Sequence, residues 1–183
     1  MISRQESRQR QLARKHALQR YQQQRARNVL AQPGVYDFVM VLDNLKAGFN
    51  VPKIFRSAEA MGACAVHLIN IGPFDPAPAK GSFKKVPAHF HDTFDECYQA
   101  LSEQGYHFYT LEPKSSTTIF NVMLPRKSAF IMGNEEFGIQ FDRNAYPDIE
   151  SISIPQFGNV ESLNVSIAAS IMMFEYVRQH YEI

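Results

Sequence analysis

The chain has 183 residues, of which 45% are hydrophobic, and its formal net charge at neutral pH is +1. This length and composition predict one domain with a sizeable core and room for an extension. No apolar run approaches the length of a membrane span, and no charged start followed by an apolar segment indicates a secretory signal. A membrane protein and a secreted protein are therefore both disfavoured.

The charge is unevenly distributed along the chain. Residues 1–35 contain eight of the 19 Lys and Arg residues and a single acid, Glu6, so this segment carries +7 and residues 36–183 carry −6. A basic arm on a mildly acidic body suits contact with a polyanion. A solubilising helix or a disordered tail is the alternative, and composition alone leaves both open.

The same basic segment is rich in glutamine and free of glycine until Gly34, which favours a helix. Its apolar residues follow only a weak period, so the segment is predicted to bury little. The Pro33-Gly34 pair marks a domain boundary. We therefore predict a basic helical N-terminal extension at residues 1–34 and a main domain at residues 35–183.

From residue 36 onward, strand patterns alternate with helix patterns. Short apolar runs predict strands at residues 36–42, 65–70, 88–91, 106–111, 127–132 and 152–154. Helical spacing of apolar residues predicts helices at residues 51–61, 94–104, 140–146 and 163–176. This alternation predicts an α/β fold with a mostly parallel sheet covered by helices on both faces. Ligands of such sheets bind beyond the carboxyl ends of the strands, where the loops 43–56, 133–138 and 155–164 are expected.

Polar residues at the helix starts are predicted to act as caps. Asn50 and Ser162 are candidate N-caps, and Thr93 with Glu96 forms a capping box. Asn164 and Ser166 follow Ser162 and exceed what one cap requires. The start of a helix also binds ligands through its unpaired N–H groups, which is the second interpretation of this polar cluster.

The last helix is expected to bury one apolar face formed by Leu163, Ile167, Ile171 and Phe174. Met172, Met173 and Tyr176 add more apolar surface than one face requires. Methionine and aromatic residues are enriched at protein interfaces, and a helix buried on all sides in a monomer is the alternative.

No metal site is predicted. Cys64 and Cys97 lack metal-ligand spacing and are typical of small buried residues in a reduced compartment, which predicts a cytoplasmic protein. His89 and His91 point the same way in an extended chain, as metal ligands can, but no third ligand follows at a suitable spacing. A structural or exposed histidine pair is the favoured interpretation.

Three separated sequence blocks resemble the signature of SpoU-type RNA ribose 2′-O-methyltransferases, within the knotted SPOUT class. The blocks are Asn50-x5-Arg56-Ser57-Ala58-x-Ala60-x-Gly62, Phe130-Ile131-Met132-Gly133-Asn134-Glu135-x-x-Gly138 and Ile154-Pro155-x-x-Gly158-x-Val160-x-Ser162-Leu163-Asn164-Val165-Ser166-x-Ala168-Ala169. They occur in the family's order, and the resemblance extends from about residue 36 to the C terminus. The third block is the most specific.

The resemblance implies a fold and a cofactor. It implies a C-terminal trefoil knot, which connectivity rules make a rare exception, and S-adenosylmethionine bound in that knot. The residues that it nominates for cofactor binding are Gly133, Ile154, Leu163 and Leu111, with Leu111 near the adenine. The chain has no G-x-G-x-x-G fingerprint of an ordinary Rossmann site.

The resemblance also implies site residues and partners. Arg56 would hold a phosphate of the RNA and stabilise the developing alkoxide, while its role as a base stays open because a guanidinium normally remains protonated. Asn50, Glu135, Ser162 and Asn164 would orient Arg56 and the ribose. Partners implied in this way are transfer or ribosomal RNA and a second copy of the chain.

Simpler interpretations of these residues remain open at this point. Asn50 is equally suited to capping its helix, Glu135 to being a solvated loop acid, and Arg56 to forming a surface ion pair. A catalytically inactive RNA-binding protein that keeps the fold is the alternative function, because Pro52 and Lys53 stand where the family commonly has Gly and Ala.

Overall fold

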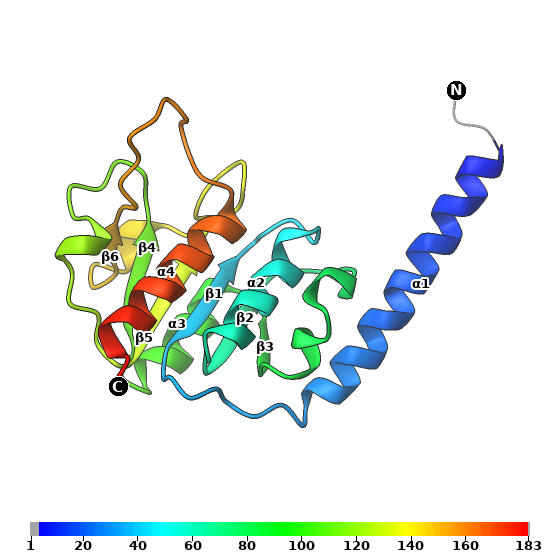
Figure 1. Ribbon diagram of the computed structural model, residues 1–183, viewed down its shortest axis with the longest axis horizontal. Coiled ribbons are helices and arrows are strands. Elements are labelled where there is room, and N and C mark those ends of the chain that lie inside the picture. The colour runs from blue at the N-terminus through cyan, green and yellow to red at the C-terminus, as the bar shows by residue number, and fades with distance from the viewer. Residues whose placement is uncertain (1–3, 183) are drawn as a thin grey trace.

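The computed structural model describes residues 4–182, which form one parallel six-stranded sheet with helices against it (Figure 1). The strands are β1 (Val39–Asp43), β2 (Ala65–Ile69), β3 (Ala88–His91), β4 (His107–Leu111), β5 (Ser128–Met132) and β6 (Glu150–Ile152). The helices are α1 (Arg4–Asn28), α2 (Asn50–Ala60), α3 (Phe94–Ser102) and α4 (Val165–His180). The strand order is β3-β2-β1-β5-β4-β6, and every neighbouring pair is parallel. The predicted α/β fold with a parallel sheet is confirmed.

Both faces of the sheet are buried, because residues alternate between two separate cores. In β1, Met40 and Leu42 pack into the core that α2 and α4 cover, whereas Val39 and Val41 pack into the core that α3 covers. All five residues of β1 are buried. A continuous apolar run is what a strand covered on both faces requires.

Two predicted elements differ from the expectation. The strand predicted at residues 152–154 lies two residues earlier, as β6, and ends at Ile152; Ser153 bonds instead to the loop after β4, where its N–H donates to the Thr117 carbonyl at 2.8 Å. The helix predicted at residues 140–146 is only a 3-10 turn, Arg143–Ala145. Pro147 accounts for the end of this turn before Tyr146, since a proline disfavours helical geometry at the preceding residue.

The predicted caps are partly wrong. Thr93 does cap α3, accepting a hydrogen bond from the Glu96 N–H at 3.3 Å. At α4 the cap is Asn164 and not Ser162, because the Asn164 Oδ1 accepts from the Ser166 N–H at 3.0 Å. Asn50 is the first residue of α2 and does not cap it, so its side chain is free for another role.

The predicted apolar face of α4 is also wrong. Ile167 is 52% exposed and Phe174 is 58% exposed, whereas Met172, Met173 and Tyr176 are buried. Apolar residues lie all round this helix, so their period does not select a buried side. The selection comes from α2 and β5, against which α4 packs.

Helix α1 buries more than its sequence predicts. The ring of Tyr21 is almost completely buried and lies 5.2 Å from the ring of Phe74 and 5.6 Å from that of Phe83. Asn28 is buried too: its Nδ2 donates to the carbonyls of Phe83 and Val86, and its Oδ1 accepts from the Ala88 N–H at 3.0 Å. The C-terminal half of α1 is therefore part of the folded body.

The N-terminal half of α1 projects away from the body beyond β3 (Figure 1). Near the middle of the helix, Arg20 binds the carboxylate of Asp75 through two nitrogens at 3.1 and 2.7 Å. Side chains from residue 5 to residue 16 are exposed. No helix within residues 4–182 has both the length and the apolarity to cross a membrane.

Replacing Tyr21 by alanine is expected to destabilise the protein by roughly 3 kcal/mol, because it empties an aromatic site that is sealed on both sides. Leu18→Ala, on the exposed side of the same helix, is the matched control and is expected to change stability by about 0.5 kcal/mol. Urea unfolding of both variants measures the difference. Equal midpoints would mean that α1 does not contribute to the core.

Candidate active site

A pocket of about 600 Å³ opens at the carboxyl ends of β4, β5 and β6 and at the start of α4. Carboxyl ends of parallel strands share one edge of a sheet, which is where α/β proteins bind ligands. The four residues predicted to bind the cofactor all line this pocket: Leu111, Gly133, Ile154 and Leu163. Three loops far apart in the sequence thus meet at one concave site.

The pocket wall depends on a glycine. A Cβ atom on Gly133 would lie 2.5 Å from the carbonyl carbon of Gly138 and 2.6 Å from the nitrogen of Ile139. The loop can fold back this closely because Asn134 and Gly138 exchange backbone hydrogen bonds of 2.8 and 2.9 Å. Glycine at position 133 is therefore a requirement of the loop that follows β5.

The pocket combines apolar walls with an unpaired acceptor. Leu111, Ile154 and Val165 supply apolar surface. The Oε1 atom of Gln156, another lining residue, is buried and has no hydrogen-bond partner among the described residues. A buried acceptor without a donor is costly, so this arrangement suits a ligand that has an apolar ring and an N–H group.

Beside the pocket, one hydrogen-bonded chain joins the three sequence blocks. The Asn50 Nδ2 donates to the Glu135 Oε1 at 2.7 Å, and the Asn164 Nδ2 donates to the Asn50 Oδ1 at 3.2 Å. Asn50 comes from α2, Glu135 from the loop after β5, and Asn164 from the start of α4. Tertiary folding thus brings together residues separated by up to 114 positions.

Glu135 is ionised at neutral pH. Its partial burial acts to raise the pKa, but hydrogen bonds from Asn50 and from the backbone N–H of Lys46, together with the charge of Lys46, bring that pKa below its usual value. The Lys46 N–H lies 3.1 Å from the Glu135 Oε2, and the Lys46 ammonium binds Glu136 at 2.7 Å. The Glu135 carboxylate is exposed, yet it accepts hydrogen bonds from residues of two other segments of the chain.

The two remaining predicted residues are exposed and available to a ligand. Arg56 lies on α2, six residues after Asn50, and forms no hydrogen bond or ion pair with any residue between 4 and 182. The alternative of a surface ion pair is therefore not realised within that range. Ser162 lines the pocket with its side chain exposed.

Sequence reasoning missed the residues that brace the loops. Asp43, fully buried at the end of β1, accepts from the Gln140 N–H at 2.6 Å and from the Asn44 side chain at 2.7 Å. Burial raises the pKa of Asp43, and these two hydrogen bonds counteract the rise. The Asn134 Nδ2 donates to the Asn44 carbonyl at 2.7 Å. The available signal was an acid directly after a buried parallel strand.

Comparison with known proteins identifies the family. The model of the SpoU rRNA Methylase family matches residues 37–174, which is most of the chain. A tRNA (guanosine(18)-2′-O)-methyltransferase of Thermus thermophilus is 31% identical over 149 residues, covering 78% of this chain and 75% of the relative. The chain belongs to the SpoU rRNA Methylase family.

Other SpoU relatives agree in sequence and in fold. A 23S rRNA (guanosine-2′-O-)-methyltransferase of Xylella fastidiosa is 28% identical over 172 residues, covering 91% of this chain and 69% of the relative. The crystal structure of the SpoU methyltransferase AviRb from Streptomyces viridochromogenes, in complex with AdoMet, superimposes with a TM-score of 0.72 at 24% identity, covering 81% of this chain and 60% of that chain. The predicted family is confirmed by the family model and by the sequence relatives, and the structural comparison agrees with its fold.

Proposed function

We propose that this SpoU-family protein methylates the ribose 2′-hydroxyl of a nucleotide in structured transfer or ribosomal RNA, with guanosine as the first candidate. The observation that carries the proposal is the hydrogen-bonded chain Glu135–Asn50–Asn164 beside the pocket. It holds polar groups from three separate segments of the chain at one place. The guanosine assignment follows the names of the relatives from Thermus thermophilus and Xylella fastidiosa.

The pocket fits S-adenosylmethionine. Its apolar residues Leu111, Ile154 and Leu163 would enclose the adenine ring, the unpaired Gln156 Oε1 would accept from an amino group, and the backbone at Gly133 would approach closely. When bound, the cofactor supplies an electrophilic methyl group on a sulfonium. Leu111, Gly133, Ile154 and Leu163 are the residues that the sequence predicts for cofactor binding, and Gln156 is a further residue of the same pocket.

The protein's own residues would then place the ribose. Arg56, which has no partner within the described chain, would hold an RNA phosphate and offset the negative charge that develops on the 2′-oxygen. Asn50, Glu135 and Asn164 form a rigid set that would fix the orientation of the sugar, because each side chain is held by another. Ser162 adds a hydroxyl at the same edge of the pocket.

A methyl-transfer assay tests this function. Purified protein is incubated with radiolabelled S-adenosylmethionine and total RNA from cells lacking the gene, and the product is mapped by its resistance to alkaline cleavage at a 2′-O-methylated nucleotide. We expect one modified position. RNA binding without transfer would instead support the alternative, an inactive RNA-binding protein, for which Pro52 and Lys53 are the motivating residues.

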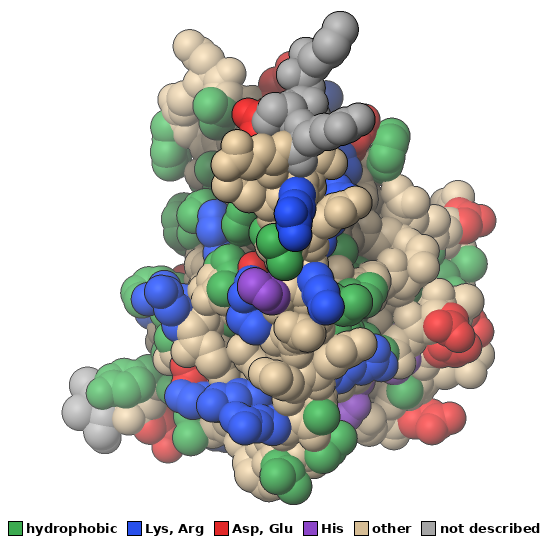
Figure 2. Space-filling view, turned by 90° about the vertical axis from the view of Figure 1, so that its right-hand side faces the viewer, with side chains coloured by type: hydrophobic (Ala, Val, Ile, Leu, Met, Phe, Trp, Pro, Cys, Tyr) green, Lys and Arg blue, Asp and Glu red, His purple; other side chains and the backbone are tan. Residues whose placement is uncertain are grey.

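The basic arm is proposed to contact RNA at the sheet edge opposite the pocket. Helix α1 lies beyond β3, whereas the pocket lies at β4, β5 and β6, at the other edge (Figure 1). Figure 2 shows Lys and Arg side chains across the middle of the face that carries α1. An RNA that reaches both regions of one chain would have to extend over the whole molecule.

Deleting residues 1–15 is expected to weaken RNA binding and to reduce its salt dependence, because each phosphate that the arm no longer neutralises lowers the slope of log affinity against log salt by about 0.7–0.9. This truncation keeps Tyr21 and Asn28, whereas deleting residues 1–31 would also remove buried structure. A full-length variant with Gln at Arg8, Arg10, Arg14 and Lys15 is the matched control for helix length. An unchanged slope in both variants would show that the arm does not bind RNA.

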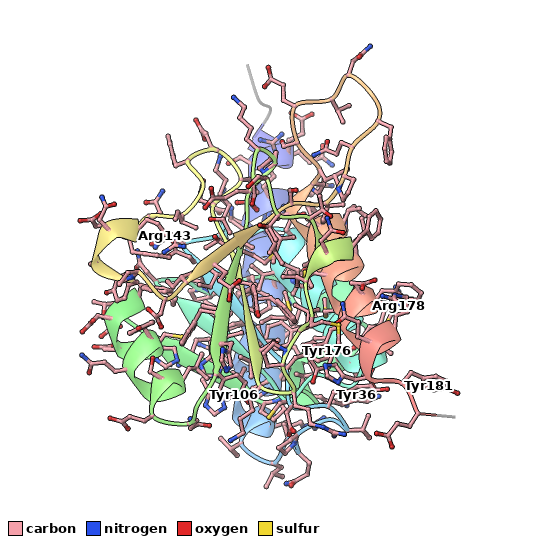
Figure 3. All side chains as sticks on the ribbon, turned by 90° about the vertical axis from the view of Figure 1, so that its left-hand side faces the viewer. Tyr36, Tyr106, Arg143, Tyr176, Arg178 and Tyr181 are labelled. Carbon is pink, nitrogen blue, oxygen red and sulfur yellow. The ribbon has the colours of Figure 1, made fainter. Side chains whose placement is uncertain are left out.

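A homodimer is proposed to form through α4 and the loop before it. Exposed apolar side chains gather there: Phe157, Val160, Ile167 and Phe174. This loop rises above the sheet in Figure 3, next to the start of α4. An exposed apolar surface on a globular domain marks an interaction site, and a second copy offers the same surface in return.

Phe174→Glu is expected to convert the dimer to a monomer, because it places a charge inside an apolar contact. Val29→Glu, which changes an exposed apolar residue in the turn that follows α1, is the control and is expected to remain dimeric. Light scattering coupled to gel filtration gives the mass of each variant. A monomeric unmodified protein would refute the dimer directly.

The C-terminal trefoil knot and the two-part organisation also remain proposals. The hydrogen bonds of Ser153 support the knot, because its N–H donates to the Thr117 carbonyl and its carbonyl accepts from the Ile119 N–H. The chain thus passes against the loop after β4 before it returns as α4, which packs on α2. Pulling single molecules from both termini tests it, because a knot tightens and shortens the extended chain.

The division into residues 1–34 and 35–183, and a cytoplasmic location, are likewise proposed. The two free cysteines, Cys64 and Cys97, favour a reduced compartment. Cell fractionation tests the location, and limited proteolysis near Pro33 tests the division.

A further inference from the structure

Away from the pocket, the fold gathers a histidine and cysteine cluster on the α3 face of the sheet. His67 and His89 are opposite each other on the parallel strands β2 and β3, and His91 follows on the same face. Cys97 lies on α3, which packs over these strands. The possible ligand atoms of His67, His91 and Cys97 all lie within 4.8 Å of one another.

The spacing of the donors is close to that of a metal site. Without a metal, the His67 Nδ1 and the His91 Nε2 share a hydrogen bond of 2.9 Å, and the planes of the two rings differ by only 7°. In a tetrahedral zinc site with bonds of about 2.0–2.3 Å, ligand atoms lie roughly 3.3–3.8 Å apart. Small side-chain rotations would therefore open the histidine pair and bring the sulfur inward.

We propose that His67, His91 and Cys97 form a binding site for a divalent zinc-type cation. Two imidazoles and one thiolate are ligands that suit zinc, whereas magnesium and calcium prefer oxygen ligands. Zinc binding replaces the S–H bond of Cys97 with a Zn–S bond and releases the thiol proton to solvent. The fourth position is taken by water or by His89, whose exposed ring lies 4.7 Å from that of His67.

Two acids lie near the cluster and could offset the charge of a bound cation. The acids whose charges act on the cluster are Asp43, which faces Cys97, and Glu96, which faces His91. Without a cation, burial raises the pKa of the Cys97 thiol to about 12, so the metal must displace a tightly held proton.

The position of the site indicates a structural role. β3 is an edge strand, and α3 contacts both β2 and β3 on the face that carries the cluster. A metal bound by one residue from β2, one from β3 and one from α3 would tie this edge together. The site is at the sheet edge opposite the pocket, so it would not take part in methyl transfer.

Cobalt substitution tests the proposal on the purified full chain. Metal-free protein titrated with Co²⁺ is expected to show one equivalent bound per chain, with the visible bands of tetrahedral cobalt and a thiolate-to-cobalt charge-transfer band in the near ultraviolet. Competition with Zn²⁺ is expected to abolish these bands. Cys97→Ser is expected to lose the charge-transfer band, and His91→Ala to weaken Zn²⁺ binding by at least about 100-fold, because even outer partners of metal ligands contribute 10–100-fold.

Two control variants test whether cobalt binding is specific to the proposed site. Cys64→Ser changes the other free cysteine and His107→Ala changes an exposed histidine of β4, and both are expected to bind cobalt as the unmodified protein does. His89→Ala decides between His89 and water in the fourth position. If the unmodified protein gives no tetrahedral cobalt spectrum, or if Cys97→Ser keeps the charge-transfer band, the site does not exist. The melting temperature of metal-free His91→Ala separates a binding defect from a folding defect.

Discussion

Arg56→Ala is expected to lower the rate of methyl transfer by roughly 100- to 1000-fold, the range found when one stabilising donor is removed from a developing oxyanion. Binding of S-adenosylmethionine is expected to stay nearly unchanged, because Arg56 is exposed on α2 and does not line the pocket. Single-turnover rates with saturating RNA and calorimetry with the cofactor measure the two quantities separately.

Two further variants define what Arg56 does. Arg56→Lys is expected to be nearly as poor as the alanine variant, because lysine lacks the planar fork that holds a phosphate at two points. Lys53→Ala removes the same charge one turn away on the exposed side of α2 and is expected to affect RNA affinity but not the rate at saturation. Near-normal turnover by Arg56→Ala would remove this residue from the mechanism.

Gly133→Ala is expected to have the second largest effect, a loss of at least about tenfold in affinity for S-adenosylmethionine, with a destabilisation of roughly 1–3 kcal/mol. The added methyl group would meet backbone atoms of Gly138 and Ile139 and not the end of a flexible side chain, so the loop itself must shift. That loop carries Glu135 and forms one wall of the pocket.

The matched control is Gly72→Ala, where an added Cβ meets no atom within 4 Å. It is expected to leave both cofactor affinity and stability close to those of the unmodified protein. Calorimetry with S-adenosylmethionine and S-adenosylhomocysteine, together with thermal unfolding, provides the comparison. Equal cofactor affinities for the two variants would place the cofactor outside this pocket.

The sequence by itself determined the fold class and the family. Buried strands such as Val39–Asp43 are continuous, largely apolar runs, and α3 begins at the predicted Thr93 cap. These signals are local, because each depends on residues a few positions apart. The three motif blocks are local as well, and they were sufficient to identify the SpoU family and to select residues that line one pocket.

Only the tertiary structure decided which groups meet. The hydrogen bonds of Asn50 to Glu135 and Asn164, the buried side of α4, and the docking of Tyr21 against Phe74 all join residues far apart in the chain. In the same way Cys97 comes to lie beside His67 and His91, although no ligand spacing in the sequence indicates it. The physical reason is that contact between distant segments depends on how whole faces pack, and an amphipathic period or a cap carries no information about the partner that it will meet.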